Sequence, residues 1–213
     1  MQAEDVANYL KDHPDFFEAY HDLLSQIYVP HPHGGRAIPL SDRQVLTLRE
    51  KSRALESKLS ELIQFGEEND ALGDKVHRLG LALLAPVAFE PYIQALYYGL
   101  REDFAVPHVA MRLWRGEGDG AEYAPVSDAL RDYAAKLEQP FCGANENFEA
   151  VSWFGEAAPR VRSVAFMPLR DRDGTFGMLA IGSEDPERFF REMGTLYLQR
   201  IADMVGAGLA RFV

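Results

Sequence analysis

A heptad repeat between residues 41 and 85 constrains this chain more than any other feature of its sequence. A helix over that range would be about 65 Å long at roughly 1.5 Å per residue, and helices in proteins draw most of their stability from packing one apolar face. The repeat places two adjacent lines of residues on such a face. The two lines carry Val45, Leu48, Ser52, Leu55, Leu59, Leu62, Gly66, Asn69, Gly73, Val76, Gly80 and Leu83. The pattern predicts a long coiled-coil-like helix that packs against a second helix.

We expect the second helix to come from another copy of the chain, and the sequence leaves open whether the two run parallel or antiparallel. Gly66, Gly73 and Gly80 lie seven residues apart, and each costs about 1 kcal/mol of helix stability relative to alanine. Their spacing favours the close approach of another helix, and a kink near Gly66 is the alternative. The expected dimer interface consists of Val45, Leu48, Leu55, Leu59, Leu62, Gly66, Gly73 and Val76.

The residues before the long helix, 1–40, form an expected N-terminal helical segment. Apolar spacing predicts helices over residues 4–13 and 14–27, whose aromatic side chains should pack on each other and on the long helix. A turn-rich connector follows, with His31 and His33 in it and His21 before it. No cysteine or acidic residue completes a metal-binding set at a familiar spacing, so we expect no metal there.

Residues 86–213 begin with Pro86 and Pro91 and have the pattern of a separate domain. We expect helices over 92–104 and 128–137, a short helical piece over 148–154, and a last helix that begins at Asp185 and Pro186. Strands are expected over 109–114, around Tyr123, and over 161–169 and 176–181, the last two joined by a hairpin turn. The predicted fold class is α+β, an antiparallel sheet covered by helices.

The composition excludes several classes of protein. The formal net charge is −11, which disfavours direct binding to nucleic acid or to anionic lipid. No apolar run reaches the ~20 residues of a membrane span, and the acidic N-terminus does not resemble a signal peptide. The chain has one cysteine, Cys142, so it forms no internal disulfide. We expect a cytoplasmic protein.

Several short motifs resemble one bacterial family. They include residues 9–17 (YLKDHPDFF), 32–35 (PHGG), 41–50 and 68–70 near the N-terminus, and residues 179–185 (LAIGSED), 188–189 and 193–195 near the end. This pattern resembles the family catalogued as domain of unknown function 484, over nearly the whole chain. The C-terminal half of that family is similar to a GAF domain, a small-molecule sensory fold, and the resemblance implies no reaction and no cofactor.

The GAF resemblance implies where a ligand would bind. The pocket would lie between the sheet and the helices of residues 128–155, and the aromatic pair Trp153 and Phe154 would act as a lid. The candidate lining residues are Met111, Leu113, Phe141, Cys142, Phe148, Trp153, Phe154, Phe166 and Met178. Residues 145–149 lack the lysine of cyclic-nucleotide sites, and Cys142 lacks the following histidine of bilin sites. Each candidate is also a plausible core residue.

Two further patterns bear on chemistry. Ser183 and Arg188 flank the expected start of the last helix, where backbone N–H groups could hold an anion, although helix capping explains these residues equally well. The sequence contains no phosphate-binding glycine loop and no nucleophile elbow, so we expect no enzyme.

The leading hypothesis is a homodimeric GAF-like sensory or adaptor protein that binds an unidentified small molecule and relays its state to a protein partner. The alternative is a pure protein-interaction module, whose pocket is filled by its own side chains.

Overall fold

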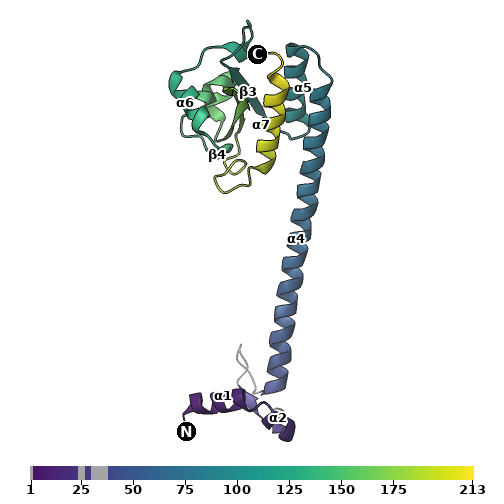
Figure 1. Ribbon diagram of the computed structural model, residues 1–213. Coiled ribbons are helices and arrows are strands. Elements are labelled where there is room, and N and C mark those ends of the chain that lie inside the picture. The colour runs from purple at the N-terminus through teal and green to yellow at the C-terminus, as the bar shows by residue number, and fades with distance from the viewer. Residues whose placement is uncertain (1, 24–26, 30–37) are drawn as a thin grey trace. The chain divides into compact units, whose positions relative to one another are not determined.

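The computed structural model describes residues 2–23, 27–29 and 38–213, without the side chains of residues 29 and 38–42 (Figure 1). By its internal contacts the chain divides into two compact units, residues 1–67 and 68–213. The boundary lies inside the long helix α4 (Leu40–Leu84), whereas the sequence pattern divides the chain at residues 40 and 85. Each unit therefore contains part of α4.

The first unit contains little buried surface. It comprises α1 (Ala3–Asp12), α2 (Phe16–Ala19), the paired strands β1 (Tyr28–Val29) and β2 (Ile38–Pro39), and the first part of α4. The expected single helix over 14–27 is wrong within the described residues, because α2 ends at Ala19 and turns occupy residues 20–22, while residues 24–26 lie outside the described residues. The aromatic rings contact one another as expected, with Phe16 near Phe17 and Tyr20, yet no residue of α1 or α2 is buried.

The second unit is built on a four-stranded antiparallel sheet with the order β3-β6-β5-β4. The strands are β3 (His108–Leu113), β4 (Phe141–Ala144), β5 (Ser163–Asp171) and β6 (Gly174–Ser183). Strands β5 and β6 form the expected hairpin, whose turn places Gly174 at a φ of 119°, a conformation that favours glycine.

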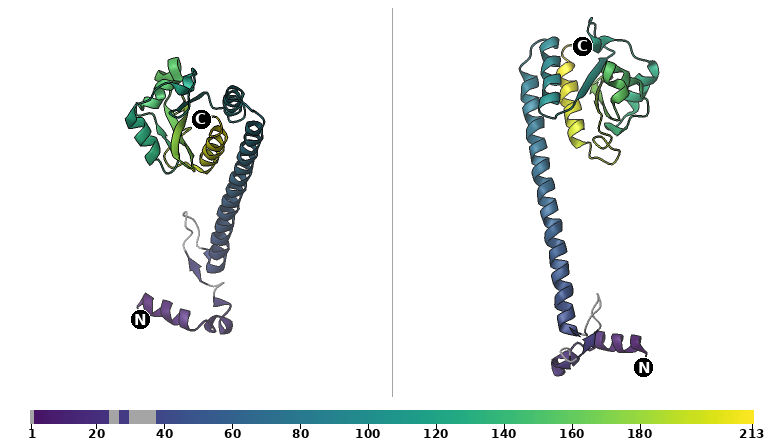
Figure 2. Two further views of the ribbon diagram at one scale, coloured as in Figure 1. Left: turned by 45° about the horizontal axis from the view of Figure 1, so that its top comes forward. Right: turned by 180° about the vertical axis from the view of Figure 1, so that it is seen from behind.

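Helices cover both faces of this sheet (Figure 2). The last part of α4, α5 (Phe89–Glu102) and α7 (Leu196–Leu209) form one core with Met111, Met167 and Leu179. On the other face, α6 (Asp128–Lys136) and the 3-10 segment η2 (Glu149–Arg160) form a second core with Phe166 and Met178. The predicted α+β class, an antiparallel sheet covered by helices, is confirmed.

Two predicted elements of this unit are wrong, and one strand was not predicted. The strand expected near Tyr123 is a 3-10 turn, η1 (Ala121–Tyr123), whose Tyr123 ring packs against Phe89 at 5.3 Å between centroids. The fourth strand is β4, which the sequence pattern missed. The last helix begins at Leu196 rather than at Asp185, because Asp185 instead closes a local turn in which its carboxylate accepts from the N–H of Glu187 at 2.9 Å.

Candidate functional site

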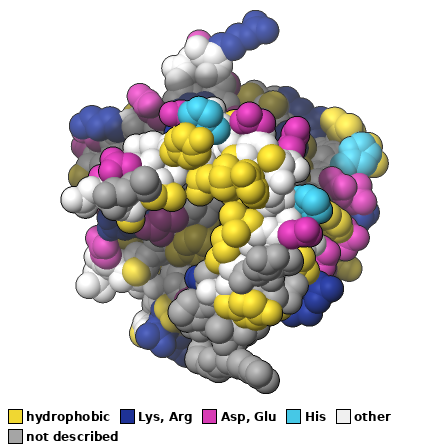
Figure 3. All heavy atoms as spheres, turned by 90° about the horizontal axis from the view of Figure 1, so that it is seen from below, with side chains coloured by type: hydrophobic (Ala, Val, Ile, Leu, Met, Phe, Trp, Pro, Cys, Tyr) yellow, Lys and Arg dark blue, Asp and Glu magenta, His cyan; other side chains and the backbone are white. Residues whose placement is uncertain are grey.

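The first part of α4 presents its hydrophobic side chains to solvent. All residues from 43 to 65 are exposed, and Leu48, Leu55 and Leu62 show 64%, 67% and 66% of their surface. We call Val45, Leu48, Leu55, Leu59 and Leu62 the leucine stripe. Val6 and Tyr9 of α1 are also exposed, at 41% and 53% of their surface, and hydrophobic side chains at the surface are yellow in Figure 3. A stripe of this kind is typical of an interaction surface.

The last part of α4 uses the same two heptad lines differently. Val76 and Leu83 are buried in the core, and the positions beside Gly73 and Gly80 are occupied by Tyr197 and Met204 of α7. The hydroxyl of Tyr197 donates to the backbone oxygen of Asn69 at 2.7 Å. Gly73 faces Tyr197 and Gly80 faces Met204, so residue numbers increase in the same direction along both helices. Helix α7 therefore runs parallel to α4, in the place where the second helix of a coiled coil would lie.

This arrangement corrects the expected dimer interface at Gly73 and Val76. Val76 is 6% exposed, and a side chain at Gly73 would lie 3.4 Å from the Tyr197 hydroxyl. The glycines leave room for large side chains of the chain's own α7 rather than for the helix of another copy. Gly66 has no atom within 4 Å of its ideal Cβ position, so its space is open.

An open groove remains between α4 and α7. Its volume is about 790 Å³, and its apolar lining includes Leu81 and Leu84 of α4 with Met204, Ala207 and Gly208 of α7. Polar side chains also line it: Arg200 and Asp203 of α7, Arg211 just after α7, and His77 of α4. Sequence reasoning missed this groove, although the α7 residues repeat with the spacing that α4 shows.

The aromatic residues expected to line a ligand pocket pack against one another. The rings of Phe141 and Phe148 lie 5.8 Å and 5.2 Å from that of Phe166, and Phe166 and Met178 are fully buried. Trp153 and Phe154 lie half-buried on η2, and Arg112 stacks over the Trp153 ring at 5.1 Å. These contacts resemble a core more than an open cavity.

The structure separates the remaining candidates for the ligand pocket from this aromatic cluster. Met111, Leu113 and Cys142 belong to the core on the opposite face of the sheet, together with α5 and α7. The nine residues therefore do not converge on one site. Phe141 and Cys142 are neighbours on β4, a strand that the sequence pattern missed, and neighbouring residues of a strand point to opposite faces.

Cys142 has the character of an inert core thiol. It is 5% exposed, and burial raises its pKa from 9.0 to about 11. Thiolate is the reactive form of cysteine, so this environment disfavours nucleophilic or redox chemistry.

The expected anion site at Ser183 and Arg188 is not assembled, because no helix begins there. Ser183 Oγ accepts from the N–H of Asp185 at 3.1 Å. Arg188 donates to the backbone oxygen of Phe104 at 2.7 Å and stacks on the ring of Phe189. Both side chains therefore serve the loop between β6 and α7.

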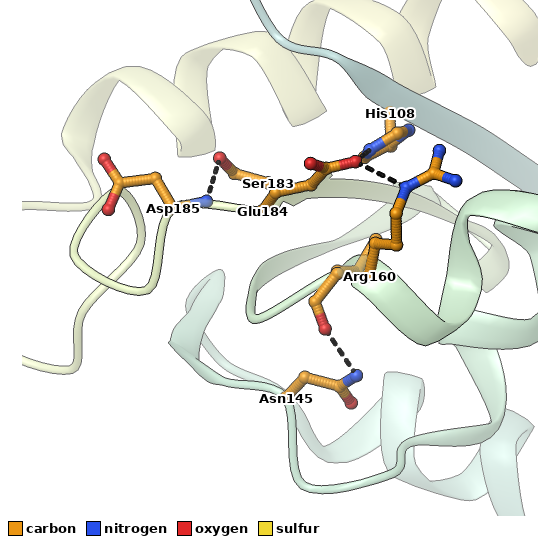
Figure 4. A network of polar contacts seen from close by, with 7 residues as sticks. His108, Asn145, Arg160, Ser183, Glu184 and Asp185 are labelled. Carbon is orange, nitrogen blue, oxygen red and sulfur yellow. Dashed lines mark hydrogen bonds and ion pairs between the residues drawn. The ribbon is translucent and has the colours of Figure 1, made fainter.

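A polar cluster that the sequence did not predict lies beside this loop (Figure 4). Arg160 of η2 donates to Glu184 at 2.8 Å, and His108 of β3 lies 3.7 Å from the same carboxylate. The hydrogen bond from Arg160 is the main cause of the lowered pKa of Glu184. The buried Nε2 of His108 has no hydrogen-bond partner among the described residues. The cluster joins the end of η2 to the ends of two strands.

Histidine offers no further site in the part of the chain that the structure describes. His21 lies 3.3 Å from Asp22, and no group of three potential metal ligands occurs among the described residues. His31 and His33 lie outside the described residues.

The family model described as "Protein of unknown function, DUF484" matches residues 1–213. The chain belongs to this family. It is 26% identical to the uncharacterized protein YigA of Salmonella typhimurium over 218 residues. The aligned region covers 98% of this chain and 91% of that protein. The family resemblance read from the motifs is confirmed.

Solved structures of GAF domains share the fold of this chain. The GAF domain of an Acinetobacter phosphoenolpyruvate-protein phosphotransferase has a TM-score of 0.50 at 15% identity, and covers 65% of this chain and 92% of its own. The GAF domain of A. aeolicus nlh2, in an inactive state, has a TM-score of 0.48 at 11% identity, covering 67% and 98%. At 15% identity the first of these likenesses shows the fold alone.

Among the helices of the described residues, none combines the length and the apolar character that crossing a membrane requires.

Proposed function

We propose that the protein is a non-catalytic regulatory or adaptor protein that acts as a homodimer joined through the leucine stripe of α4. One observation carries the proposal, the complete exposure of residues 43–65 with heptad leucines about two-thirds exposed. Burying a leucine side chain stabilises a complex by about 1.5–3 kcal/mol before the cost of association. In an unpaired helix these leucines would stay in contact with water, and the stabilisation from burying them would not be gained.

The charges beside the stripe match a second copy of the chain. If Val45 and Leu48 are the a and d positions of the heptad, Lys51 is a g position and Glu56 is the following e position. In a parallel pair of helices, a g residue faces the next e residue of the partner. Lys51 would then face the partner's Glu56, which favours the parallel arrangement.

Sedimentation velocity of the full chain tests this dimer. We expect the wild type to sediment as a dimer and the variant Leu55→Asp/Leu62→Asp as a monomer, because two buried charges per helix oppose pairing. The variant Ala54→Asp/Ser57→Asp adds the same charge away from the stripe and should remain dimeric. Fluorescence of Trp114 and Trp153, both in the second unit, reports whether each variant keeps that unit folded. A monomeric wild type, or a dimeric stripe variant, would show that the proposal is wrong.

The GAF-like unit supplies the output surface in this proposal, and the packing of Phe141, Phe148 and Phe166 favours one form of it. Because these rings fill the sheet face where a ligand was expected, a pure protein-interaction module is favoured over a small-molecule sensor. Mass spectrometry of protein purified without added ligand, under native and denaturing conditions, separates the two. A stoichiometric co-purifying molecule, released on denaturation, would restore the sensor; unliganded protein supports the interaction module.

A further inference from the structure

The groove between α4 and α7 is flanked by a line of exposed residues on α7. Arg200, Asp203 and Ala207 follow one another at spacings of three and four, so they lie on one outer line of the helix. The groove of about 790 Å³ lies on one side of this line. A second hollow of about 730 Å³, lined by residues 170–173 with Asp203, Ala207 and Ala210, lies on the other. The α7 line is therefore a ridge with a hollow along each flank.

The apolar side chains beside the groove are so exposed that they indicate an interaction surface. Leu81 shows 55% of its surface and Leu84 shows 73%, and Val87, three residues after the end of α4, shows 92%. Leu84 lies four residues after Gly80 and seven after His77, so these three share one side of α4. A ridge flanked by hollows suits a helix of the same shape, because ridges of one helix pack into the grooves of another.

The charges on the ridge suit a copy of itself. Arg200 and Asp203 are exposed and carry opposite charges, and no ion pair joins either of them to another described residue. Asp203 accepts from Gln199 at 2.7 Å, and Arg200 stacks over the ring of Tyr197. In a two-fold interface every contact occurs twice, so Arg200 can face Asp203 of the second copy while Asp203 faces its Arg200.

We propose that a second copy of this chain closes the α4–α7 groove, with the two α7 ridges packed across a two-fold axis and Arg200 paired with Asp203 between copies. The inference rests on the proposed homodimer and adds to it a direct contact between the two GAF-like units. An apolar ligand or a different protein in the groove would be inconsistent with it.

Cysteine cross-linking in the full chain tests the contact. The native Cys142 is buried and has a raised pKa, so a single introduced cysteine reacts selectively near neutral pH. The variant Ala207→Cys places a thiol at the centre of the ridge, and Ala135→Cys places one at an exposed position of α6, on the opposite face of the sheet. With a short bismaleimide, Ala207→Cys should give covalent dimers and Ala135→Cys, like the wild type, should give none.

The outcomes distinguish this inference from the proposed function. If the protein sediments as a dimer but Ala207→Cys fails to cross-link, the groove contact is refuted and the leucine-stripe dimer stands. If the wild type is a monomer, both fail. Cross-linking of Ala207→Cys and Ala135→Cys to equal extents would also refute the contact, because it indicates random collision.

Charge reversal provides a second, independent test. Arg200→Asp and Asp203→Arg each place like charges opposite one another twice in a homodimer, whereas mixing the two variants restores both pairs. With differently labelled variants, we expect the exchange constant, the squared concentration of mixed dimer divided by the product of the two homodimer concentrations, to exceed its statistical value by about tenfold, equivalent to about 1.4 kcal/mol. The double variant Arg200→Asp/Asp203→Arg should associate like the wild type. A statistical mixture would overturn the proposed pairing.

Discussion

Replacing Gly73, Gly80 and Gly206 by alanine, one at a time, should change the stability of the second unit in a graded order. All three lie inside helices, so each substitution gains about 1 kcal/mol of helix propensity. The surroundings of the new methyl group differ. It would lie 3.4 Å from the hydroxyl of Tyr197 at Gly73, and 3.0 Å from the sulfur of Met204 at Gly80. At Gly206 it would lie 2.8 Å from the backbone oxygen of Arg170.

These contacts decide how much of the gain in helix propensity appears as a higher free energy of unfolding. At Gly73 the contact is ordinary, so Gly73→Ala should keep most of the ~1 kcal/mol. At Gly80 the flexible Met204 side chain must move aside, and the net change should be close to zero. At Gly206 the obstacle is the backbone of β5, which cannot rotate away, and overpacking of this kind costs about 1–3 kcal/mol. Gly206→Ala should therefore be less stable than Gly73→Ala by about 1–3 kcal/mol.

Urea and thermal unfolding of the three variants measure this order. Trp114 and Trp153 are the only tryptophans, and both lie in the second unit, so their fluorescence follows that unit alone. A difference of 1 kcal/mol corresponds to about 2–4 °C in melting temperature for a domain of this size. If Gly206→Ala were as stable as Gly73→Ala, the close packing of Gly206 on the backbone of β5 would be refuted.

Three other substitutions or reactions test the cores and the polar cluster. Phe166→Ala should lower the free energy of unfolding by about 3–5 kcal/mol, measured in urea, and the half-exposed Phe154→Ala should lower it less. The native thiol of Cys142 should react with a disulfide reagent at pH 8 about 100-fold more slowly in the folded protein than in urea, because a pKa of about 11 instead of 9.0 leaves correspondingly less thiolate. The raised pKa also makes the free energy of unfolding depend on pH. The contribution of the neutral thiol is fully present below about pH 9 and is lost as pH rises through about 11. Arg160→Gln should raise the pKa of Glu184 in an NMR titration, since the Arg160 hydrogen bond is the main cause of its lowered value, and any stabilisation from this carboxylate is lost as pH falls through its folded pKa.

The sequence predicted the parts of the fold whose residues repeat. The heptads placed α4 within one residue of its observed ends, and the alternation of residues 161–181 predicted the β5–β6 hairpin. It missed β4, because Phe141–Ala144 is short and contains Gly143, and its strand structure depends on pairing with β5. It also began α7 too early, because Asp185 and Pro186 resemble a helix start while the carboxylate of Asp185 serves a local turn.

The candidate sites were harder to predict, because they depend on which elements meet. His108 and Arg160 come from β3 and η2, Glu184 directly follows β6, and no local pattern connects them. At Gly73 and Gly80 a helix packs on the glycine line of α4, but it is the chain's own α7 rather than a second copy, and at Gly66 the space is open. A comparison of spacings offered a signal: Tyr197 and Met204 are seven residues apart, as are Gly73 and Gly80.

The occupation of that line by α7 limits how far two copies of α4 can pair. Beyond Asn69, whose backbone oxygen binds the Tyr197 hydroxyl, the heptad positions of α4 are filled from within the chain. Pairing along the leucine stripe is thereby restricted to residues 45–62, fewer than the three to four heptads over which coiled coils are usually recognised. So short a seam gives a weak dimer on its own, because the buried leucines must also offset the cost of association. A second contact through the exposed ridge of α7 supplies the missing surface. The stripe variants and the ridge variants should therefore each weaken the homodimer.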